Sequence, residues 1–326
     1  MSILPRIFKY VWTQIEISTK FIKISKNIDI VILFIGGAAL LLPILSAKLL
    51  KKRVVLFTPG SASQITANQY DGKITGAEKA ILYFILRMLE RINLHLADRI
   101  VVESEGAIAS MGLEKYKDKL SVNCALYVDF DLFKIDKALV DRRNLIGYIG
   151  RLSSEKGVLN FAKAIPLILK ERGDLEFLIG GDGQLLGEIR NELKRSGAFD
   201  KVEFTGWIPH DELPRYLNEL KLIISPSYTE GGIPAVIQEA MACGTIALVT
   251  AVAGVDVITD DETGFILEDN SPECIARKVI QVLKHPQLKS VINSAHNLVR
   301  EEYSYESEVR RYRNMLCAVS PDLGRG

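Results

Sequence analysis

Cysteine is scarce in this sequence of 326 residues, and its four copies lie far apart. Cys124, Cys243, Cys274 and Cys317 form no C-x-x-C pair, which argues against a zinc knuckle or a redox dithiol. We see no His, Cys, Asp and Glu cluster with metal-ligand spacing. Four unpaired thiols fit a reducing compartment, so we predict a cytoplasmic location.

An excess of one charge is also lacking, because 41 Lys and Arg residues face 40 Asp and Glu residues and leave a net charge of +1. This balance argues against a broad basic surface, so we expect no nucleic-acid partner. Low-complexity sequence is lacking as well, since 48% hydrophobic and 25% charged residues are typical of globular chains. The length allows about two domains.

One uncharged run, Ile30 to Ala47, reaches the length of a membrane-spanning helix, although two glycines and a proline interrupt it. The alternative is a buried strand over Ile28–Phe34, a glycine turn and a buried helix over Ala38–Leu50. We favour this alternative, because continuous Ile, Val and Leu are typical of parallel strands. The first residues show no cleavable signal peptide.

From Asn144 onward, short β-branched runs alternate with amphipathic stretches, as in a parallel sheet with helices on both faces. The expected strands are Leu145–Ile149, Leu175–Ile179, Val202–Phe204, Leu222–Ser225 and Ile246–Thr250. A sparser series of the same kind precedes them, with strands at Ile28–Phe34, Val54–Phe57, Ile100–Val102 and Leu120–Cys124. We predict two Rossmann-like, doubly wound α/β domains that face across a cleft, the N-terminal one shortened.

The polar segment Lys134 to Asn144 is the predicted linker between these domains. We expect an acceptor-side domain over residues 1–138, a donor-binding domain over 139–300 and a C-terminal helix over 301–326. Ligands of open α/β sheets lie beyond the carboxyl ends of the strands, so the site should be built from the loops that follow them.

Two of these loops carry cations or glycines. The string GRLSSEKG, from Gly150 to Gly157, opens a helix with Arg151 and Lys156, a pair that suits a diphosphate but also a solvated loop. Gly181 and Asp182 lie in GGDG, where glycine admits a close ligand or only a tight turn. This string is not G-x-G-x-x-G, so a nicotinamide dinucleotide is disfavoured.

The string SPSYTEGGIPAVIQEAMACG leads from a strand into a helix through Gly232 and a proline. Backbone amides at Ile233, Ala235 and Val236 would be free to donate to phosphate oxygens. Glu239, one turn further on, could accept hydrogen bonds from ribose hydroxyls. Glu230 could face the sugar at the start of the loop, and the alternative for both acids is exposure to solvent.

A further string, FTGWIP, places Ile208 where its backbone could read the edge of a base, or where it forms a plain turn. The four histidines, His95, His210, His285 and His296, are expected to have structural roles.

Taken together, GRLSSEKG, GGDG, FTGWIP and EGGIPAVIQEAMACGT, followed by DETGF, resemble the retaining glycosyltransferases of family 4, the group 1 glycosyl transferases with GT-B architecture. The resemblance covers residues 144–283. It implies metal-independent transfer of a hexosyl-type sugar from a nucleotide-diphosphate sugar to a glycan or lipid-linked acceptor, with no cofactor besides the donor. Arg151 and Lys156 would hold the diphosphate, Glu239 the ribose, Glu230 the sugar and the Ile208 segment the base. A last helix that crosses back to the first domain would also be typical.

Three features depart from that family. Glu230 and Glu239 are nine positions apart instead of eight, and the loop Thr58–Ser63 has no histidine where many relatives carry one. The chain also opens with a helix instead of a strand and a glycine-rich loop. Two alternatives therefore stay open: a non-catalytic binding or regulatory subunit of a transferase complex, and a nucleotide-sugar epimerase of the same architecture.

The opening helix, expected over Ile7–Ile24, interleaves lysines with large apolar residues such as Trp12. Such a basic amphipathic helix is typical of a protein that lies on an anionic membrane surface. It is equally compatible with a helix that packs on its own sheet. We therefore predict peripheral association with the cytoplasmic face of a membrane as one alternative.

Overall fold

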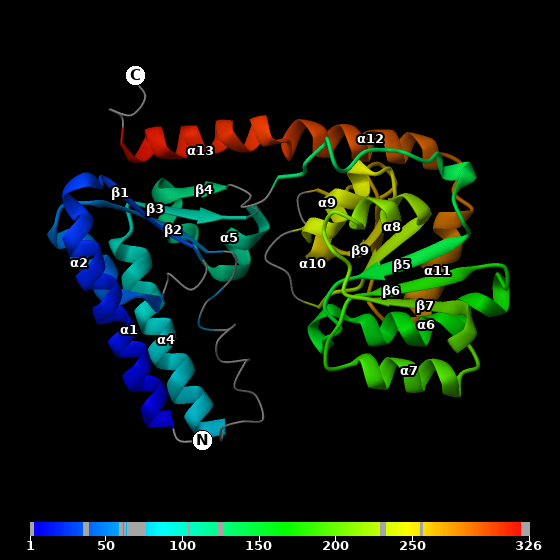
Figure 1. Cartoon of the computed structure of the whole chain (residues 1–326), viewed down its shortest axis with the longest axis horizontal. Helices are drawn as coiled ribbons and strands as arrows, with labels where there is room; N and C mark the ends of the chain where they lie inside the picture. Colours follow the sequence, from blue (N-terminus) through cyan, green and yellow to red (C-terminus); the bar gives the residue numbers. More distant parts are fainter. Residues whose placement is uncertain are drawn as a thin grey trace. The chain divides into compact units, whose positions relative to one another are not determined.

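The computed structural model describes residues 3–34, 39–58, 61, 63, 76–103, 105–122, 127–228, 233–254 and 257–320. The chain divides into two compact units, one made of Met1–Cys124 with Arg310–Gly326 and the other of Ala125–Val309. Figure 1 labels the helices and strands of both units.

The first unit is built on a parallel sheet of four strands in the order β1-β2-β3-β4. The strands are β1 (Ile30–Leu33), β2 (Arg53–Phe57), β3 (Arg99–Val102) and β4 (Leu120–Val122). Its helices are α1 (Ile3–Ile24), α2 (Leu41–Leu49), α4 (Gly76–Leu96), α5 (Glu105–Met111) and the end of α13 (Tyr305–Val319). The predicted strands and helices of this part of the chain are confirmed, with their ends shifted by a few residues.

Alternate residues of β2 belong to different hydrophobic clusters, as the two-residue period of a strand requires. Val54 and Leu56 pack with apolar residues of α2 and with Leu94 of α4. Val55 and Phe57 pack instead with Met315 and other residues of α13. The C-terminal helix therefore covers one face of the first sheet.

The uncharged run Ile30 to Ala47 contains strand β1 and all but the last two residues of helix α2, so the alternative of a strand followed by a helix is confirmed; the predicted glycine turn lies outside the described residues. Among the helices that the structure describes, none combines the length and the apolarity needed to span a membrane.

The second unit is built on a parallel sheet of six strands in the order β10-β9-β8-β5-β6-β7. The strands are β5 (Leu145–Ile149), β6 (Glu176–Gly180), β7 (Val202–Gly206), β8 (Leu222–Ser225), β9 (Ile246–Thr250) and β10 (Phe265–Leu267). The helices are α6 (Val158–Glu171), α7 (Leu186–Arg195), α8 (Leu213–Glu219), α9 (Ala235–Ala242), α10 (Ala251–Gly254), α11 (Pro272–Leu283), α12 (Leu288–Glu302) and the start of α13. The five predicted strands are confirmed, and β10 is an addition.

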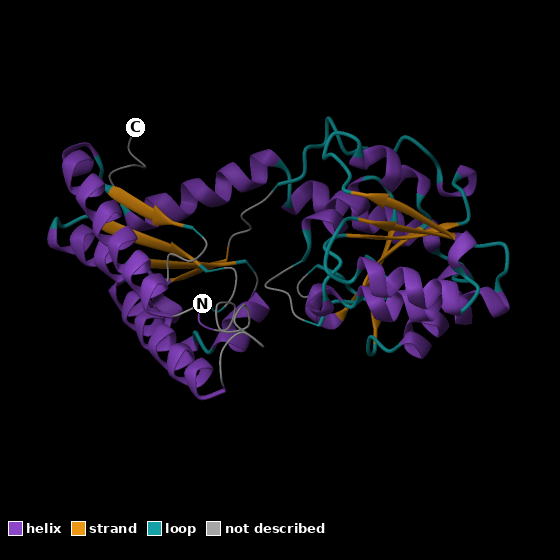
Figure 2. Ribbon diagram, turned by 60° about the horizontal axis from the view of Figure 1, so that its bottom comes forward, coloured by secondary structure: helices purple, strands orange, loops and turns teal. Residues whose placement is uncertain are grey.

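Helices cover both faces of this sheet (Figures 1 and 2). One hydrophobic cluster joins α6, α7 and α11 to inward residues such as Ile146, and the other joins α8, α9 and α12 to residues such as Ile223. The structure therefore has two parallel sheets with packed helices, the smaller one in the N-terminal part of the chain. This confirms the predicted fold class.

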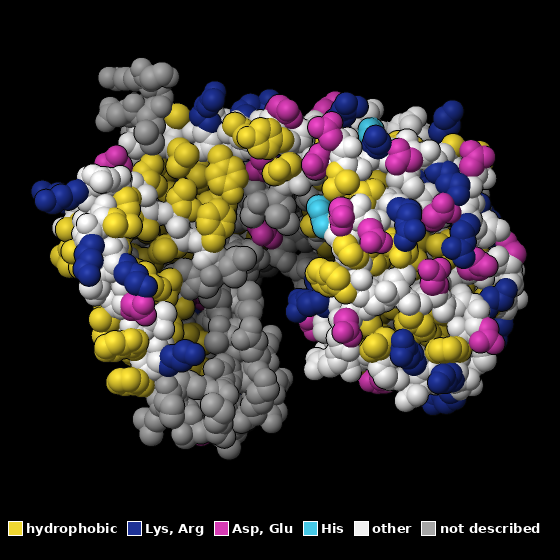
Figure 3. Space-filling view, in the orientation of Figure 1, with side chains coloured by type: hydrophobic (Ala, Val, Ile, Leu, Met, Phe, Trp, Pro, Cys, Tyr) yellow, Lys and Arg dark blue, Asp and Glu magenta, His cyan; other side chains and the backbone are white. Residues whose placement is uncertain are grey.

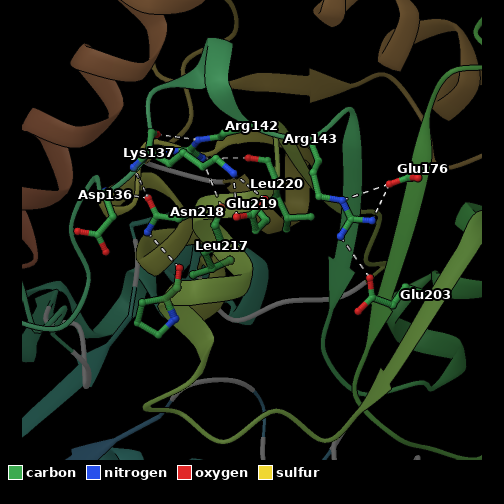
Figure 4. Close-up of polar contacts among 11 residues, drawn as sticks. Asp136, Lys137, Arg142, Arg143, Glu176, Glu203, Leu217, Asn218, Glu219 and Leu220 are labelled. Carbon is green, nitrogen blue, oxygen red and sulfur yellow. Dashed lines mark hydrogen bonds and ion pairs between the residues drawn. The ribbon is translucent and has the colours of Figure 1, made fainter.

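The predicted linker, residues 134–144, is bound into the second unit instead of lying free between the units (Figure 4). The backbone amide of Asp136 donates to Asn218 Oδ1 at 2.9 Å. The guanidinium of Arg142 is buried and donates to four carbonyl oxygens and one hydroxyl, those of Lys137, Leu217, Leu220, Cys243 and Thr245. The polar composition of this segment therefore reflects internal hydrogen bonds, which a charged sequence alone does not distinguish from solvation.

Candidate functional site

The strand order of the second sheet reverses between its central strands β5 and β8. From β5 the chain proceeds to β6 and β7 on one side, and from β8 to β9 and β10 on the other. The helices that follow the two central strands, α6 and α9, pack on opposite faces of the sheet. In doubly wound sheets this reversal is where ligands bind, beyond the carboxyl ends of the strands. The predicted site residues follow these strands.

The loops after β5 and β8 lie directly against each other. Gly157 adopts the left-handed conformation, with φ of 67°, and a Cβ there would come within 2.0 Å of the carbonyl oxygen of Pro226. The backbone amide of Tyr228 donates to the carbonyl of Glu155 at 2.8 Å. Glycine is required at residue 157 both for its conformation and for the close approach of these two backbones.

The loop after β5 is also attached to the loop after β6. The amide of Leu152 donates to the carbonyl of Asp182 at 2.9 Å. Gly181 has φ of 112°, and a Cβ there would lie 2.0 Å from the carbonyl oxygen of Gly150. The side chain of Asp182 accepts from the amide of Gly183 at 2.7 Å. In the ligand-free chain, the GGDG string thus serves close backbone packing and a local turn.

Arg151 and Lys156 both act on one carboxylate, that of Glu155. Arg151 is largely exposed, and its Nη1 lies 3.6 Å from Glu155 Oε1. Burial alone would raise the pKa of Glu155, but a hydrogen bond from the Ser153 hydroxyl and the charges of Arg151 and Lys156 outweigh it and lower that pKa. Arg151 and Lys156 thus lie in one short loop on either side of this carboxylate.

Helix α9 begins at Ala235, and no side chain caps its first turn. Pro234 is the N-cap residue, one position before the first residue of the helix, and its carbonyl accepts from the amide of Ile237 at 2.9 Å. Within the described part of the chain, the amides of Ala235 and Val236 have no hydrogen-bond acceptor, and Ile233 just before them is half-buried. Uncapped amides at a helix start are suited to bind an anion.

Glu239 lies one turn into α9, and only 12% of its side chain is exposed. Burial raises the pKa of its carboxyl, while a hydrogen bond with His210 opposes that shift. His210 Nε2 lies 2.8 Å from Glu239 Oε1. His210 was predicted to be a structural histidine, although its position two residues after Ile208, in a loop assigned to the base, was a signal for the site.

Ile208 follows β7, and its side chain lies over the end of β6, where a Cβ on Gly180 would be 2.9 Å from Ile208 Cδ1. The amide of Gly181 donates to the carbonyl of Gly206 at 2.7 Å, which attaches the β6 loop to the end of β7. Loops after four strands, β5, β6, β7 and β8, are thus held together at one edge of the sheet. Glu230 and Gly232 lie outside the described residues.

Comparison with known proteins identifies the family. A family model described as glycosyl transferases group 1 matches residues 129–301, more than half of the chain. An uncharacterized glycosyltransferase of Methanocaldococcus jannaschii is 26% identical over 281 residues, which cover 82% of this chain and 68% of the relative. The capsular polysaccharide biosynthesis glycosyltransferase CapM of Staphylococcus aureus is 25% identical over 71% of this chain and 64% of its own length. Other curated relatives are matched over half of their length or less.

The fold has a solved counterpart in Anabaena HepE in complex with UDP, with a TM-score of 0.75 at 15% identity over 92% of this chain and 82% of HepE. At this identity the similarity establishes the shared GT-B type of fold. The match of the family model includes the strand reversal and every described loop of the candidate site. The chain therefore belongs to the group 1 glycosyl transferases, glycosyltransferase family 4.

Proposed function

We propose that this chain transfers a hexosyl-type sugar from a nucleoside-diphosphate sugar to a glycan or lipid-linked acceptor, with retention of configuration. The bond between the anomeric carbon and the diphosphate oxygen breaks, and the acceptor oxygen bonds to the same face of that carbon. The acceptor proton passes to the departing phosphate oxygen. The observation that carries the proposal is that the loop with Arg151 and Lys156 lies against the loop that leads to α9, joined by the hydrogen bond from the Tyr228 amide to the Glu155 carbonyl at the strand reversal.

In this mechanism the protein mainly stabilises charge. Negative charge grows on the diphosphate as the sugar departs, and cations positioned beforehand lower the barrier because they interact most strongly at that stage. Arg151 and Lys156 supply the cations, and the amides of Ala235 and Val236 supply hydrogen-bond donors. Glu155 partly neutralises the two cations, and the donor diphosphate would replace it as their partner on binding.

The remaining residues bind the rest of the donor. Glu239 accepts from the ribose hydroxyls, and the backbone near Ile208 contacts the base. Glu230 contacts the transferred sugar, and Gly232 lets the backbone approach the phosphates. UDP is the first nucleotide to test, because HepE, which shares the fold, was solved with it.

The decisive experiment follows donor consumption and acceptor labelling together. The purified chain is incubated with a panel of nucleotide sugars and an acceptor extract, and both free nucleoside diphosphate and sugar attached to acceptor are measured. We expect Lys156→Ala and Arg151→Ala each to lower turnover by about 10²-fold to 10³-fold, the usual effect of losing one stabilising group. Lys163→Ala, an exposed lysine on α6, is the control and should leave turnover unchanged.

The same experiment separates the alternatives. Donor binding without any turnover would identify a non-catalytic subunit. Conversion of the nucleotide sugar to its epimer without labelled acceptor would identify an epimerase. Turnover at the wild-type rate in both Lys156→Ala and Arg151→Ala would refute the site.

Two helices of the first unit bury polar side chains and expose apolar ones, the reverse of the usual amphipathic arrangement. Their exposed surface suggests the environment in which the acceptor is located. Helix α1 buries Gln14 and Ser18 but exposes large apolar side chains: Phe8, Val11, Trp12, Ile15 and Ile22. Helix α4 buries Glu90 and Asn93 but exposes Ile81, Phe84, Ile85, Met88 and Ile92. Exposed apolar stripes at helical spacing indicate a surface that meets an apolar partner.

We propose that this partner is an anionic membrane surface. Lys9, Lys20, Lys23 and Lys26 are exposed beside the α1 stripe, and Figure 3 shows basic and hydrophobic side chains interleaved over this part of the first unit. Lysines around exposed aromatic residues are typical of helices that lie in the lipid headgroup region. A lipid-linked acceptor would then be available at the same surface, and CapM, a relative in capsular polysaccharide biosynthesis, supports such an envelope acceptor.

Vesicle flotation tests this surface. We expect binding to vesicles that contain phosphatidylglycerol and little binding to neutral phosphatidylcholine. Trp12→Ser and Phe84→Ser should each weaken binding about tenfold, since burying a large apolar side chain contributes about 1.5–3 kcal/mol. Val140→Ser, a still more exposed apolar residue of the second unit, is the control. No flotation with anionic vesicles would refute membrane binding, and self-association abolished by Trp12→Ser would assign the stripe to a second copy.

A further inference from the structure

His210 and Glu239 connect two parts of the second unit that are distant in the sheet. His210 belongs to the loop after β7, and Glu239 belongs to the helix after β8, three positions away in the strand order. Their side chains meet at 2.8 Å, although 65% of the histidine side chain is exposed and the glutamate is mostly buried. Phe133, which is fully buried, packs beside the imidazole at 5.1 Å between ring centroids.

The chemistry of the pair defines which atom donates. An ionised carboxylate only accepts hydrogen bonds, so His210 Nε2 carries the proton and donates to Oε1 of Glu239. The described residues offer no hydrogen-bond partner to the other oxygen, Oε2. Glu239 is therefore held by one oxygen and can accept from a ligand with the other.

We propose that His210 is a positioning residue for donor recognition: it holds the Glu239 carboxylate so that it accepts from the ribose hydroxyls of the nucleotide. This inference rests on the proposed function. It makes His210 a determinant of selectivity for ribonucleotides over deoxyribonucleotides, through Glu239 and without contact between His210 and the ribose.

The physical reason is that a carboxylate with few hydrogen bonds is costly to keep ionised in a mostly buried place. Burial raises the pKa of Glu239, and the bond from His210 favours the ionised form. Without His210 the carboxyl would lose this donor and the restraint on its rotation. The precision of the ribose contact would fall, while the phosphate contacts of Arg151 and Lys156 would be unaffected.

The test compares binding of a nucleoside diphosphate and its 2′-deoxy form by calorimetry, with UDP, ADP and GDP as probes. Wild type should prefer the ribose form of its nucleotide by at least tenfold, because hydrogen bonds to charged groups contribute about 1.5–3 kcal/mol. His210→Ala should reduce that preference to about threefold or less. His210→Gln should retain most of it, since the Gln side-chain amide is also an N–H donor.

A matched control is available in His296 of α12, which contacts the end of α9. His296 Nδ1 lies 3.0 Å from the carbonyl oxygen of Ala242 at the end of α9, so His296→Gln removes a histidine that contacts the helix away from Glu239. It should leave the preference unchanged. In turnover, His210→Ala should raise KM for the donor and leave kcat within about twofold, which a loss of folded protein would not do.

The outcomes separate the inference from the proposed function. Equal weakening of ribose and deoxyribose forms in His210→Ala, or additive effects in the double variant with Glu239→Gln, would overturn the positioning role. An unchanged preference in Glu239→Gln would instead remove Glu239 from the ribose site. Failure of all three nucleotides to bind the wild-type protein would refute the proposed function itself.

Discussion

The two parallel sheets of this chain differ in what surrounds them. In the second unit, helices cover both faces, and the loops at the carboxyl ends are joined by backbone hydrogen bonds and close glycine contacts. In the first unit, α1 and α4 direct large apolar side chains to the surface and polar ones inward. The second sheet thus has closely connected polar loops at its carboxyl edge, whereas the first sheet is packed by helices with exposed apolar side chains.

Each unit contains one of the two tryptophans of the chain, so each can be followed separately. Trp12 lies in α1 and Trp207 lies after β7. Variants that keep only one tryptophan, Trp207→Phe or Trp12→Phe, therefore report on the first or the second unit by fluorescence.

The largest effect is expected from Arg142, which holds residues 134–144 in the second unit. Arg142→Met would leave several buried carbonyl oxygens without a donor, and we expect a loss of about 3–5 kcal/mol in the free energy of unfolding. Urea unfolding followed by Trp207 measures it, while the Trp12 signal should stay unchanged.

The neighbouring Arg143 is the control for that variant. It forms half-exposed ion pairs with Glu176 at 2.6 Å and Glu203 at 3.6 Å, which contribute about 1 kcal/mol or less. Similar losses in Arg142→Met and Arg143→Met would show that the buried hydrogen bonds do not stabilise the second unit.

A smaller loss is expected from Gly157→Ala. The added Cβ would clash with the carbonyl of Pro226, so we expect a loss of at least about 2 kcal/mol together with weaker donor binding. Gly197 has a similar φ of 72°, but a Cβ there would meet nothing within 4 Å, so Gly197→Ala should cost about 1 kcal/mol and leave donor binding intact. Equal effects on donor binding would contradict the contact between the two loops.

Acid should destabilise the first unit through Asp98. Burial alone would raise the pKa of this carboxyl, but hydrogen bonds from Lys48 Nζ and the Val54 amide, both at 2.8 Å, lower it below its usual 3.8. A lowered pKa contributes stability above the ordinary value, and that stability is lost as pH falls through the folded-state pKa. We expect Asp98→Asn to lower the free energy of unfolding of the first unit by about 1 kcal/mol at pH 7, as measured by Trp12 fluorescence. The loss of stability with falling pH should also become less steep. If the stability of Asp98→Asn still falls steeply with pH, other titrating groups cause that loss.

The smallest change in the free energy of unfolding is expected from Glu239→Gln in the second unit. This substitution should stabilise the protein, unlike the preceding ones. Because folding raises the pKa of this carboxyl, its contribution to stability is greatest at pH values below its ordinary pKa of 4.5. That contribution is lost as pH rises through the folded-state pKa. Glu239→Gln should therefore stabilise the second unit at pH 7 by up to about 1 kcal/mol while it weakens nucleotide binding. Destabilisation at pH 7 would show that the ionised carboxylate is favourable in the ligand-free protein.

Much of the fold follows from local patterns in the sequence. Strands β5, β8 and β9 have the predicted ends, because a run of β-branched residues between polar turns specifies a buried strand almost by itself. Strand β10 was missed because it has three residues and follows a turn motif. The position of the GRLSSEKG loop directly after a strand was also predicted from the sequence, while the role of its cations stays a prediction.

Other features depend on contacts that no local pattern contains. The apolar spacing of α4 predicts one hydrophobic face, but whether another element covers that face depends on the rest of the fold. The charged residues 134–144 suggested a linker, although Arg142 bonds to carbonyls and a hydroxyl 75 to 103 positions further along the chain. His210 meets Glu239 only because the loops after β7 and β8 come together at the edge of the sheet.

The sequence by itself determined the succession of strands and helices, the type of sheet and the loops that carry charge, because hydrophobic periodicity and turn residues act over a few positions. Only the tertiary structure decided which polar groups are paired, which apolar faces remain uncovered and which side chains share a site. These outcomes depend on the strand order of the sheets, which brings together residues that are far apart in the chain and have no local signal for each other.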